Sequence, residues 1–95
     1  VATFAKVIAD TTVVLLDVRT PEEYEEAHIG NAINIDVLQD NFESKAISIL
    51  PKDKKIALYC RSGKRSKKAA NILAAKGYKI IELNTGYLGW IEAKK

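Results

Sequence analysis

Short apolar segments rich in β-branched residues alternate with helical segments along this chain. The clearest of them, residues 12–18, has the near-continuous hydrophobic pattern of a strand that is buried on both faces. Similar segments occur at residues 32–35, 55–60 and 79–83. Strands that alternate with helices favour a parallel sheet covered by helices, because each crossover helix packs back onto the sheet. The alternation therefore predicts an α/β fold.

The helical segments carry residues that commonly begin and end helices. Thr20 is followed by Pro21 and Glu23, which predicts an N-cap, a proline in the first turn and a capping box. Gly77 predicts the end of a helix over residues 64–76. Further helices are expected at residues 2–9, in part of 36–50 and at 86–94.

Length and composition indicate a single soluble domain over residues 1–95. The chain is 47% hydrophobic and 28% charged, as is usual for globular proteins. No apolar run approaches the roughly 20 residues of a membrane span, and the first residues lack the pattern of a signal peptide. We expect a monomer in the cytoplasm or, if a leader has been removed, in the periplasm.

Cys60, the one cysteine of the chain, ends a predicted strand directly before the helix over residues 64–76. Ligands of parallel sheets bind at the carboxyl ends of the strands. Gly63 permits backbone angles that turn N–H groups inward, and the helix start adds further N–H groups. Such surroundings lower the pKa of a cysteine and favour a thiolate that faces an anion. We therefore predict Cys60 as the catalytic nucleophile, with six substrate-binding residues: Arg61, Ser62, Gly63, Lys64, Arg65 and Ser66.

Other interpretations of this loop remain open. Cys60 alone is compatible with a small buried hydrophobic residue at a strand end. The cations between Arg61 and Lys68 are compatible with a solvated helix start or with a nucleic-acid contact, but the chain has no aromatic interleaving and no groove-reading motif. Together with the thiol, the cations favour a trap for a small anion. A single cysteine excludes an intramolecular disulfide and a multi-cysteine metal site. We expect no metal, nucleic-acid or membrane partner.

Three separated segments resemble motifs of the rhodanese (sulfurtransferase) family. They are Asp17-Val18-Arg19-Thr20-Pro21-Glu22-Glu23-Tyr24 with His28-Ile29-Gly30-Asn31-Ala32-Ile33-Asn34, then Cys60-Arg61-Ser62-Gly63-Lys64-Arg65, and Gly86-Tyr87-Leu88-Gly89-Trp90. The resemblance implies a three-layer sandwich, in which helices flank a central five-stranded parallel sheet. It also implies that sulfane sulfur from thiosulfate or a similar anionic donor is carried as a persulfide on Cys60. The acceptor would be cyanide in an assay and a thiol or a protein in the cell. No cofactor is needed, because the persulfide is itself the carrier.

The sequence departs from the family pattern at two positions. Ala27 stands where a glycine usually precedes the histidine, and Tyr87 stands where a second glycine is usual. We expect both to affect local turns more than chemistry.

Two alternatives to sulfur transfer come from other classes of protein. The related cysteine phosphatases and arsenate reductases carry a cysteine, five residues and then an arginine. Here Ser66 occupies that position and Arg65 comes one residue early, which favours sulfur over phosphate. The other alternative is an interaction module that carries or senses a persulfide with little turnover.

Asp17, Arg19 and His28 are predicted as supporting residues. Asp17 and Arg19 could form an ion pair or steer the substrate, and the first role is favoured. His28 is the one histidine and hence a candidate general base, but its motif context favours a structural hydrogen bond near a turn. Ser66 could donate its hydroxyl to the anion or cap the helix.

Overall fold

The computed structural model describes residues 2–83 and 85–93. A leading helix is followed by strands and helices in alternation: α1 (Ala2–Ile8), β1 (Val14–Asp17), α2 (Pro21–Glu26), β2 (Ile33–Asn34), α3 (Phe42–Ile49), β3 (Lys55–Tyr59), α4 (Lys64–Ala75), β4 (Lys79–Glu82) and α5 (Gly86–Ala93). The predicted α/β class is confirmed. Lys94, the last residue of the final predicted helix, lies outside the described residues.

The strands form one parallel sheet in the order β2-β1-β3-β4. In its centre, Asp17 at the end of β1 is in register with Tyr59 at the end of β3. The chain passes from β1 to β2 on one side of β1 and then crosses to β3 on the other side. The winding therefore reverses between β1 and β3. Open α/β sheets bind ligands at the carboxyl ends of the strands beside such a switch point.

The resemblance implied five strands, and the part of the chain that the structure describes contains four. A fifth strand needs a fifth extended segment, whereas the remaining described residues form helices, turns and loops. The first strand is also shorter than the predicted segment 12–18. The cause is a turn, in which the N–H and the hydroxyl of Thr12 donate to Asp10 Oδ1 at 2.9 and 2.7 Å.

The predicted start of α2 is confirmed. The N–H of Glu23 donates to Thr20 Oγ1 at 3.3 Å, and the N–H of Thr20 donates to Glu23 Oε1 at 3.1 Å, which completes a capping box. The predicted end of α4 is confirmed as well, because Gly77 follows the helix with φ of +93°. This capping box lies close to the candidate site, since its glutamate also binds Arg65.

The third helix occupies only the second half of the predicted segment 36–50. The residues before it form turns, in which Asp36 Oδ1 accepts the N–H of Leu38 at 2.9 Å and the Asp36 carbonyl accepts the N–H of Gln39 at 3.2 Å. An aspartate side chain that binds the backbone two residues ahead competes with helix formation. No helix among residues 2–83 and 85–93 is long and apolar enough to cross a membrane.

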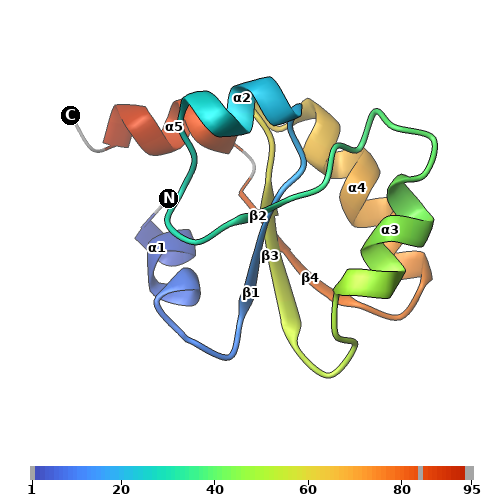
Figure 1. Cartoon of the computed structure of the whole chain (residues 1–95). Helices are drawn as coiled ribbons and strands as arrows, with labels where there is room; N and C mark the ends of the chain where they lie inside the picture. Colours follow the sequence, from blue (N-terminus) through green and yellow to red (C-terminus); the bar gives the residue numbers. More distant parts are fainter. Residues whose placement is uncertain (1, 84, 94–95) are drawn as a thin grey trace.

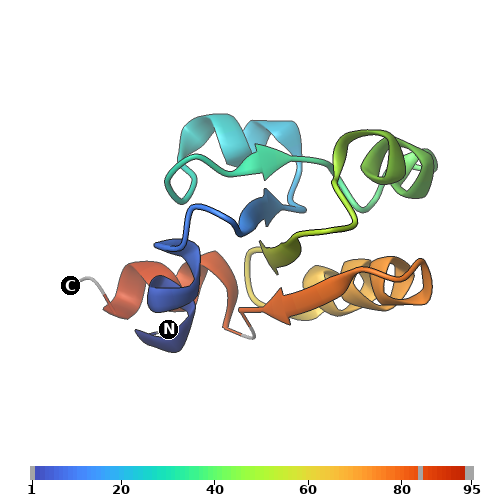
Figure 2. The same cartoon turned by 90° about the horizontal axis from the view of Figure 1, so that it is seen from below.

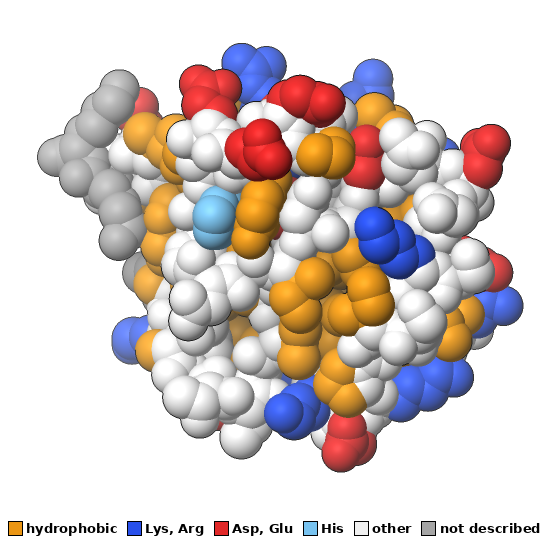
Figure 3. All heavy atoms as spheres, viewed as in Figure 1, with side chains coloured by type: hydrophobic (Ala, Val, Ile, Leu, Met, Phe, Trp, Pro, Cys, Tyr) orange, Lys and Arg blue, Asp and Glu red, His pale blue; other side chains and the backbone are white. Residues whose placement is uncertain are grey.

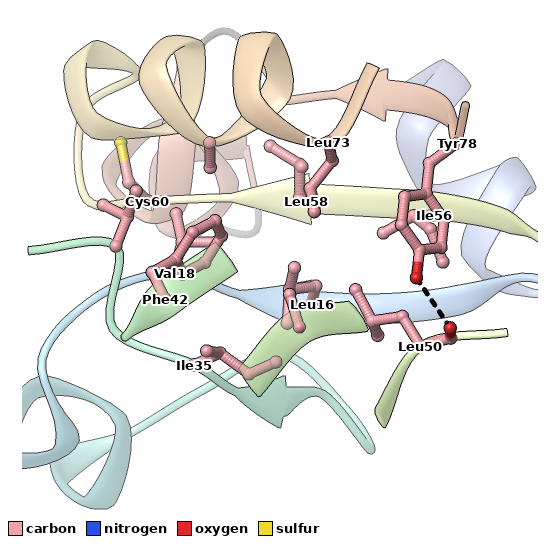
Figure 4. Packing of buried hydrophobic residues seen from close by; sticks show 13 residues of the cluster. Leu16, Val18, Ile35, Phe42, Leu50, Ile56, Leu58, Cys60, Leu73 and Tyr78 are labelled. Carbon is pink, nitrogen blue, oxygen red and sulfur yellow. Dashed lines mark hydrogen bonds between the residues drawn. The ribbon is translucent and has the colours of Figure 1, made fainter. Parts of the chain in front are cut away.

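Helices cover both faces of the sheet. Figures 1 and 2 show α3 and α4 on one side, with α1 and α5 on the other. The first face holds a cluster in which Leu16, Ile56 and Leu58 meet Phe42 and Leu73 (Figure 4). A second cluster on the opposite face contains Phe4, Ile29, Ala57, Tyr59 and Leu83, with Trp90 packed against it. The molecule is therefore a three-layer sandwich, as predicted, and Trp90 contributes to packing.

Candidate active site

Cys60 directly follows β3 at the switch point of the sheet. Residues alternate between the two faces of a strand, so Tyr59 faces the α1 and α5 side and Cys60 faces the α3 and α4 side. The sulfur points toward the first turn of α4 (Figure 4). The residue is only 1% exposed. The sequence of β3 thus places the thiol between the sheet and the start of a helix.

The loop that follows folds back over the sulfur. Gly63 has φ of +104°, in the region that side chains disfavour, and it is the N-cap of α4. Its N–H donates to Cys60 Sγ at 3.0 Å. The conformation predicted for Gly63 is therefore observed, and it aims a backbone donor at the sulfur.

The environment of Cys60 favours its thiolate form. Burial opposes ionisation, but the backbone N–H of Ser66, the Ser66 hydroxyl and the N–H groups of Gly63 and Ser62 outweigh it. Together these donors hold the pKa of the Cys60 thiol below its ordinary value. The loop is therefore a cradle of donors around one anionic sulfur.

The start of α5 holds the base of this loop. The N–H of Tyr87 donates to the Cys60 carbonyl at 2.7 Å, and the N–H of Leu88 donates to the Arg61 carbonyl at 3.0 Å. Gly86 has φ of +65°, and a Cβ there would lie 2.5 Å from the Arg61 carbonyl oxygen. The motif that begins at Gly86 therefore brings the backbone of α5 close enough to hold the loop by hydrogen bonds.

Three cations surround the cradle in different ways. Arg61 and Lys64 are exposed. Arg65 is partly buried and binds Glu23 through two hydrogen bonds, of 2.8 and 3.1 Å. The Arg65 guanidinium in turn lowers the pKa of the Glu23 carboxyl to about 2. Part of the charge predicted for anion binding is therefore compensated by α2, a contact that the sequence did not reveal.

The two serines of the loop differ in burial. Ser62 is exposed, whereas Ser66 is fully buried. The Ser66 hydroxyl lies 3.0 Å from the Gly63 carbonyl oxygen and 2.6 Å from Glu82 Oε2. Glu82 was not predicted as a site residue. An acidic residue at the carboxyl end of an apolar strand was the signal that could have identified it.

A cavity of about 310 Å³ adjoins the loop. Its wall is formed in part by Arg61, Tyr87, Leu88 and Ile91, together with Arg19 and with Glu23 and Glu26 of α2. Tyr87 also covers Arg19, whose guanidinium carbon lies 4.5 Å from the centre of its ring. The tyrosine that replaces a family glycine therefore shapes the neighbourhood of the loop, beyond the local turn that we expected it to affect.

Asp17 and Arg19 form a buried ion pair at the end of β1. Arg19 donates to both carboxylate oxygens of Asp17, at distances down to 2.6 Å, and also to the Ala27 carbonyl. The Tyr59 hydroxyl donates to Asp17 at 2.8 Å and accepts the N–H of Ile29 at 3.0 Å. This network links β1, β3 and the segment after α2.

His28 lies at the surface, where it is the pale blue side chain in Figure 3. Its Nδ1 is 2.9 Å from the Tyr24 carbonyl oxygen, and its ring stacks on that of Tyr24. Because a carbonyl only accepts, Nδ1 carries the hydrogen. Acidic side chains gather above it, along α2 (Figure 3). Within residues 2–83 and 85–93, no group of three or more His, Cys, Asp or Glu side chains could hold a metal ion.

Comparisons with known proteins agree with this architecture. Thiosulfate sulfurtransferase PspE of Escherichia coli (strain K12) is 38% identical over 73 residues, which cover 77% of this chain and 68% of PspE. A crystal structure of a rhodanese-related protein from Thermoplasma volcanium matches with a TM-score of 0.85 and 35% identity, over 97% of this chain and 87% of that one.

Other relatives carry a different name. The tRNA uridine(34) hydroxylase of Legionella pneumophila (strain Paris) is 36% identical over 92 residues, which cover 90% of this chain but 35% of the hydroxylase. The likeness therefore extends to proteins of more than one activity. The model of the family described as rhodanese-like domain matches residues 1–93. The chain therefore belongs to the rhodanese-like domain family.

Proposed function

We propose that this protein is a sulfurtransferase that accepts sulfane sulfur from thiosulfate or a similar anionic donor and carries it as a persulfide on Cys60. The observation that carries the proposal is the 3.0 Å hydrogen bond from the Gly63 N–H to Cys60 Sγ, inside a loop that lowers the pKa of the thiol. Such a loop suits a sulfur anion that is charged both before and after transfer. The likeness to a thiosulfate sulfurtransferase supports the same chemistry.

In the first step, the Cys60 thiolate attacks the outer sulfur of thiosulfate. A new sulfur–sulfur bond forms, and the bond between the two sulfur atoms of thiosulfate breaks. Sulfite leaves with the electron pair of the broken bond. Arg61 and Lys64, which are exposed beside the loop, attract the donor and the departing anion. Arg65 adds a positive charge that Glu23 partly offsets.

In the second step, a thiophilic acceptor attacks the terminal sulfur of the persulfide. With cyanide, a carbon–sulfur bond forms and the sulfur–sulfur bond breaks. Its electron pair returns to Cys60 as the thiolate, and thiocyanate leaves. The N–H groups of Ser62, Gly63 and Ser66 stabilise the sulfur anion throughout, because they are in place before the reaction begins. In the cell the acceptor is a thiol or a protein.

Intact-mass analysis of the reduced protein tests this function directly. The mass is measured before thiosulfate, after thiosulfate, and again after cyanide. We expect a gain of one sulfur atom that cyanide removes as thiocyanate. Cys60→Ser is the control; it should keep the fold and gain nothing. Loading of that variant would contradict the mechanism.

An absence of loading in the unmodified protein would point to the alternatives. Phosphate ester and arsenate assays would then test a phosphatase-like or arsenate-reducing enzyme. Rapid loading with weak turnover on cyanide would instead favour a persulfide carrier, for which the acceptor is a partner protein.

A further inference from the structure

A second cavity, of about 340 Å³, lies at the opposite end of the sheet from Cys60. Lys55 begins β3 and Lys79 begins β4, whereas Cys60 directly follows the end of β3 (Figure 1). The volume lies near the lower end of the roughly 300–1,000 Å³ that is usual for small-molecule pockets. The wall is formed by four lysines, two aspartates and a threonine: Lys52, Lys54, Lys55, Lys79, Asp10, Asp53 and Thr12. The lysines outnumber the aspartates, so the wall carries an excess of positive charge.

Two of these lysines lie directly beside each other on neighbouring strands. Lys55 and Lys79 are register partners in the parallel pair of β3 and β4, and both are exposed. Register partners project from the same face of a sheet, and like charges in such a position repel each other. Lys6 of α1 adds a further positive charge, because it lines an adjoining cavity of about 240 Å³ together with Lys55. An anion that binds between these ammonium groups would replace their repulsion by attraction.

The charges of the cavity are not balanced by ion pairs. Among the residues that the structure describes, no carboxylate forms an ion pair with any of the four lysines of the wall. Lys52 instead places its Nζ 5.8 Å from the centre of the Tyr78 ring. Asp10 is engaged in its own turn, where its Oδ1 accepts both the N–H and the hydroxyl of Thr12. The hollow therefore presents a positive potential to solvent, which favours a negatively charged ligand.

We propose that this cavity is a second anion site, which binds a small ligand with several phosphate groups through Lys52, Lys54, Lys55 and Lys79. A phosphoryl group carries about −1.5 to −2 charges at pH 7 and has three acceptor oxygens. Lysine binds such groups as a point charge that several rotatable donors can adjust. A chain of phosphates can contact several of the ammonium groups at once, and the size of the cavity favours a compact ligand over a polymer. The wall shares no residue with the loop around Cys60, so the proposal does not depend on sulfur transfer.

An amide NMR titration with inorganic triphosphate locates the site. We expect the backbone signals of residues 52–55 and of Lys79 to shift as triphosphate is added, and the binding to weaken as salt is raised. The signals of residues 61–66 report separately on any anion that enters the cradle around Cys60. A parallel titration with ATP identifies the source of the phosphates. Equal affinities would assign recognition to the phosphate chain alone, and tighter binding of ATP would assign the site to a nucleotide.

A pair of double variants tests whether the lysines of the wall form the site. Lys55→Gln/Lys79→Gln should weaken triphosphate binding by about tenfold, because two of the four ammonium groups are lost. Lys45→Gln/Lys68→Gln is the matched control, since it removes the same charge from exposed residues of α3 and α4 that do not line the cavity. It should weaken binding by less than about twofold.

The stability of the protein without ligand gives a second readout. Lys79→Gln removes the repulsion with Lys55, so it should raise the urea midpoint slightly while it weakens triphosphate binding. Triphosphate should raise the midpoint of the unmodified protein more than that of this variant, because a ligand of the folded state stabilises it. Urea unfolding also checks that each variant folds.

Three outcomes would overturn the proposal. They are signal shifts confined to residues 61–66, an equal loss of affinity in the two double variants, and tighter binding of a single-stranded oligonucleotide than of triphosphate by the same lysines. The last result would identify the cluster as a nucleic-acid contact. None of these measurements uses thiosulfate, so the result stands even if the protein fails to accept sulfur.

Discussion

Two polar sites at the carboxyl ends of neighbouring strands are built in opposite ways. At the end of β1, the Asp17 carboxylate is buried and saturated by Arg19 and Tyr59. At the end of β3, backbone donors converge on the Cys60 sulfur, and the loop that supplies them reaches the surface at Arg61 and Ser62. The first site is closed by its own partners, whereas the second, in the function that we propose, is completed by a reacting anion.

The two sites meet at adjacent residues of the chain. Tyr59 and Cys60 are consecutive, but strand geometry sends their side chains to opposite faces of the sheet. Burial raises the pKa of the Tyr59 phenol, so its hydroxyl remains a donor to Asp17 at neutral pH. This network can therefore anchor β3 immediately beside Cys60 without competing for the donors of the loop. We infer that the network around Asp17 stabilises the conformation of the loop around Cys60.

The comparison predicts its largest effect on stability at Asp17. Asp17→Asn removes the charge opposite Arg19, which is only 4% exposed, and should lower the free energy of unfolding by about 3–5 kcal/mol. Cys60→Ser, in contrast, should lower it by less than about 1 kcal/mol while abolishing sulfur loading. Urea denaturation measures both. Similar losses in the two variants would show that the sites do not divide stability and chemistry as we argue.

Gly86→Ala should give the next largest loss of stability, because Gly86 lies where the start of α5 packs directly against the loop after Cys60. A Cβ in Gly86→Ala would lie 2.5 Å from the Arg61 carbonyl oxygen and 2.7 Å from that of Cys60. We expect a loss of about 2–4 kcal/mol, from backbone strain and from overpacking, together with slower sulfur loading. The measurements are urea denaturation and loading kinetics.

Gly77→Ala is the matched control for that variant. Gly77 also has a positive φ, of +93°, but a Cβ added there would meet nothing within 4 Å. It should lose only the backbone part, about 1–2 kcal/mol, and load sulfur at the normal rate. If both variants lose stability equally and load alike, Gly86 does not hold the loop.

The sequence predicted those parts of the site that depend on neighbouring residues. The capping box needs only Thr20 and Glu23, three positions apart, and the cradle needs only a glycine between a strand and a helix. The pair between Glu23 and Arg65 joins residues 42 positions apart, and Ser66 meets Glu82 across 16. Such contacts depend on strand order and helix placement, which no local pattern fixes.

The positions of the strands, too, could be predicted where they depend on local sequence. Four apolar segments predicted four strands at nearly the observed positions, whereas the fifth came only from the resemblance. The turn that shortens β1 uses the polar pair Asp10 and Thr12. The turns before α3 use Asp36 in the same manner. In both cases an aspartate side chain hydrogen-bonds the backbone two residues ahead, and the strand or helix starts later than predicted.

Arg65 is partly neutralised by its partner Glu23 and also lies near Cys60, so we expect its removal to have a moderate effect on both stability and substrate binding. Arg65→Ala should raise the KM for thiosulfate several-fold, because a charge beside the cradle is lost, while stability falls by about 1 kcal/mol. Glu23→Gln keeps the cation and removes its partner, so its KM should stay the same or fall. Steady-state kinetics measure both variants. An unchanged KM in Arg65→Ala would assign Arg65 to the scaffold alone.

The smallest effect concerns acid stability. The Arg65 guanidinium lowers the pKa of Glu23 to about 2 from 4.5. A carboxyl whose pKa is depressed by folding stabilises the protein fully above its unfolded value and loses that contribution as the pH falls toward the folded value. Stability should therefore decline between about pH 4.5 and 2. We expect about 1 kcal/mol from this pair, since both side chains are partly exposed. Urea denaturation at pH 6 and pH 3 should show this part of the decline in the unmodified protein and not in Glu23→Gln. If the two proteins lose the same stability over this range, the contact between α2 and α4 adds nothing to the fold, and Arg65 is free to serve the open site.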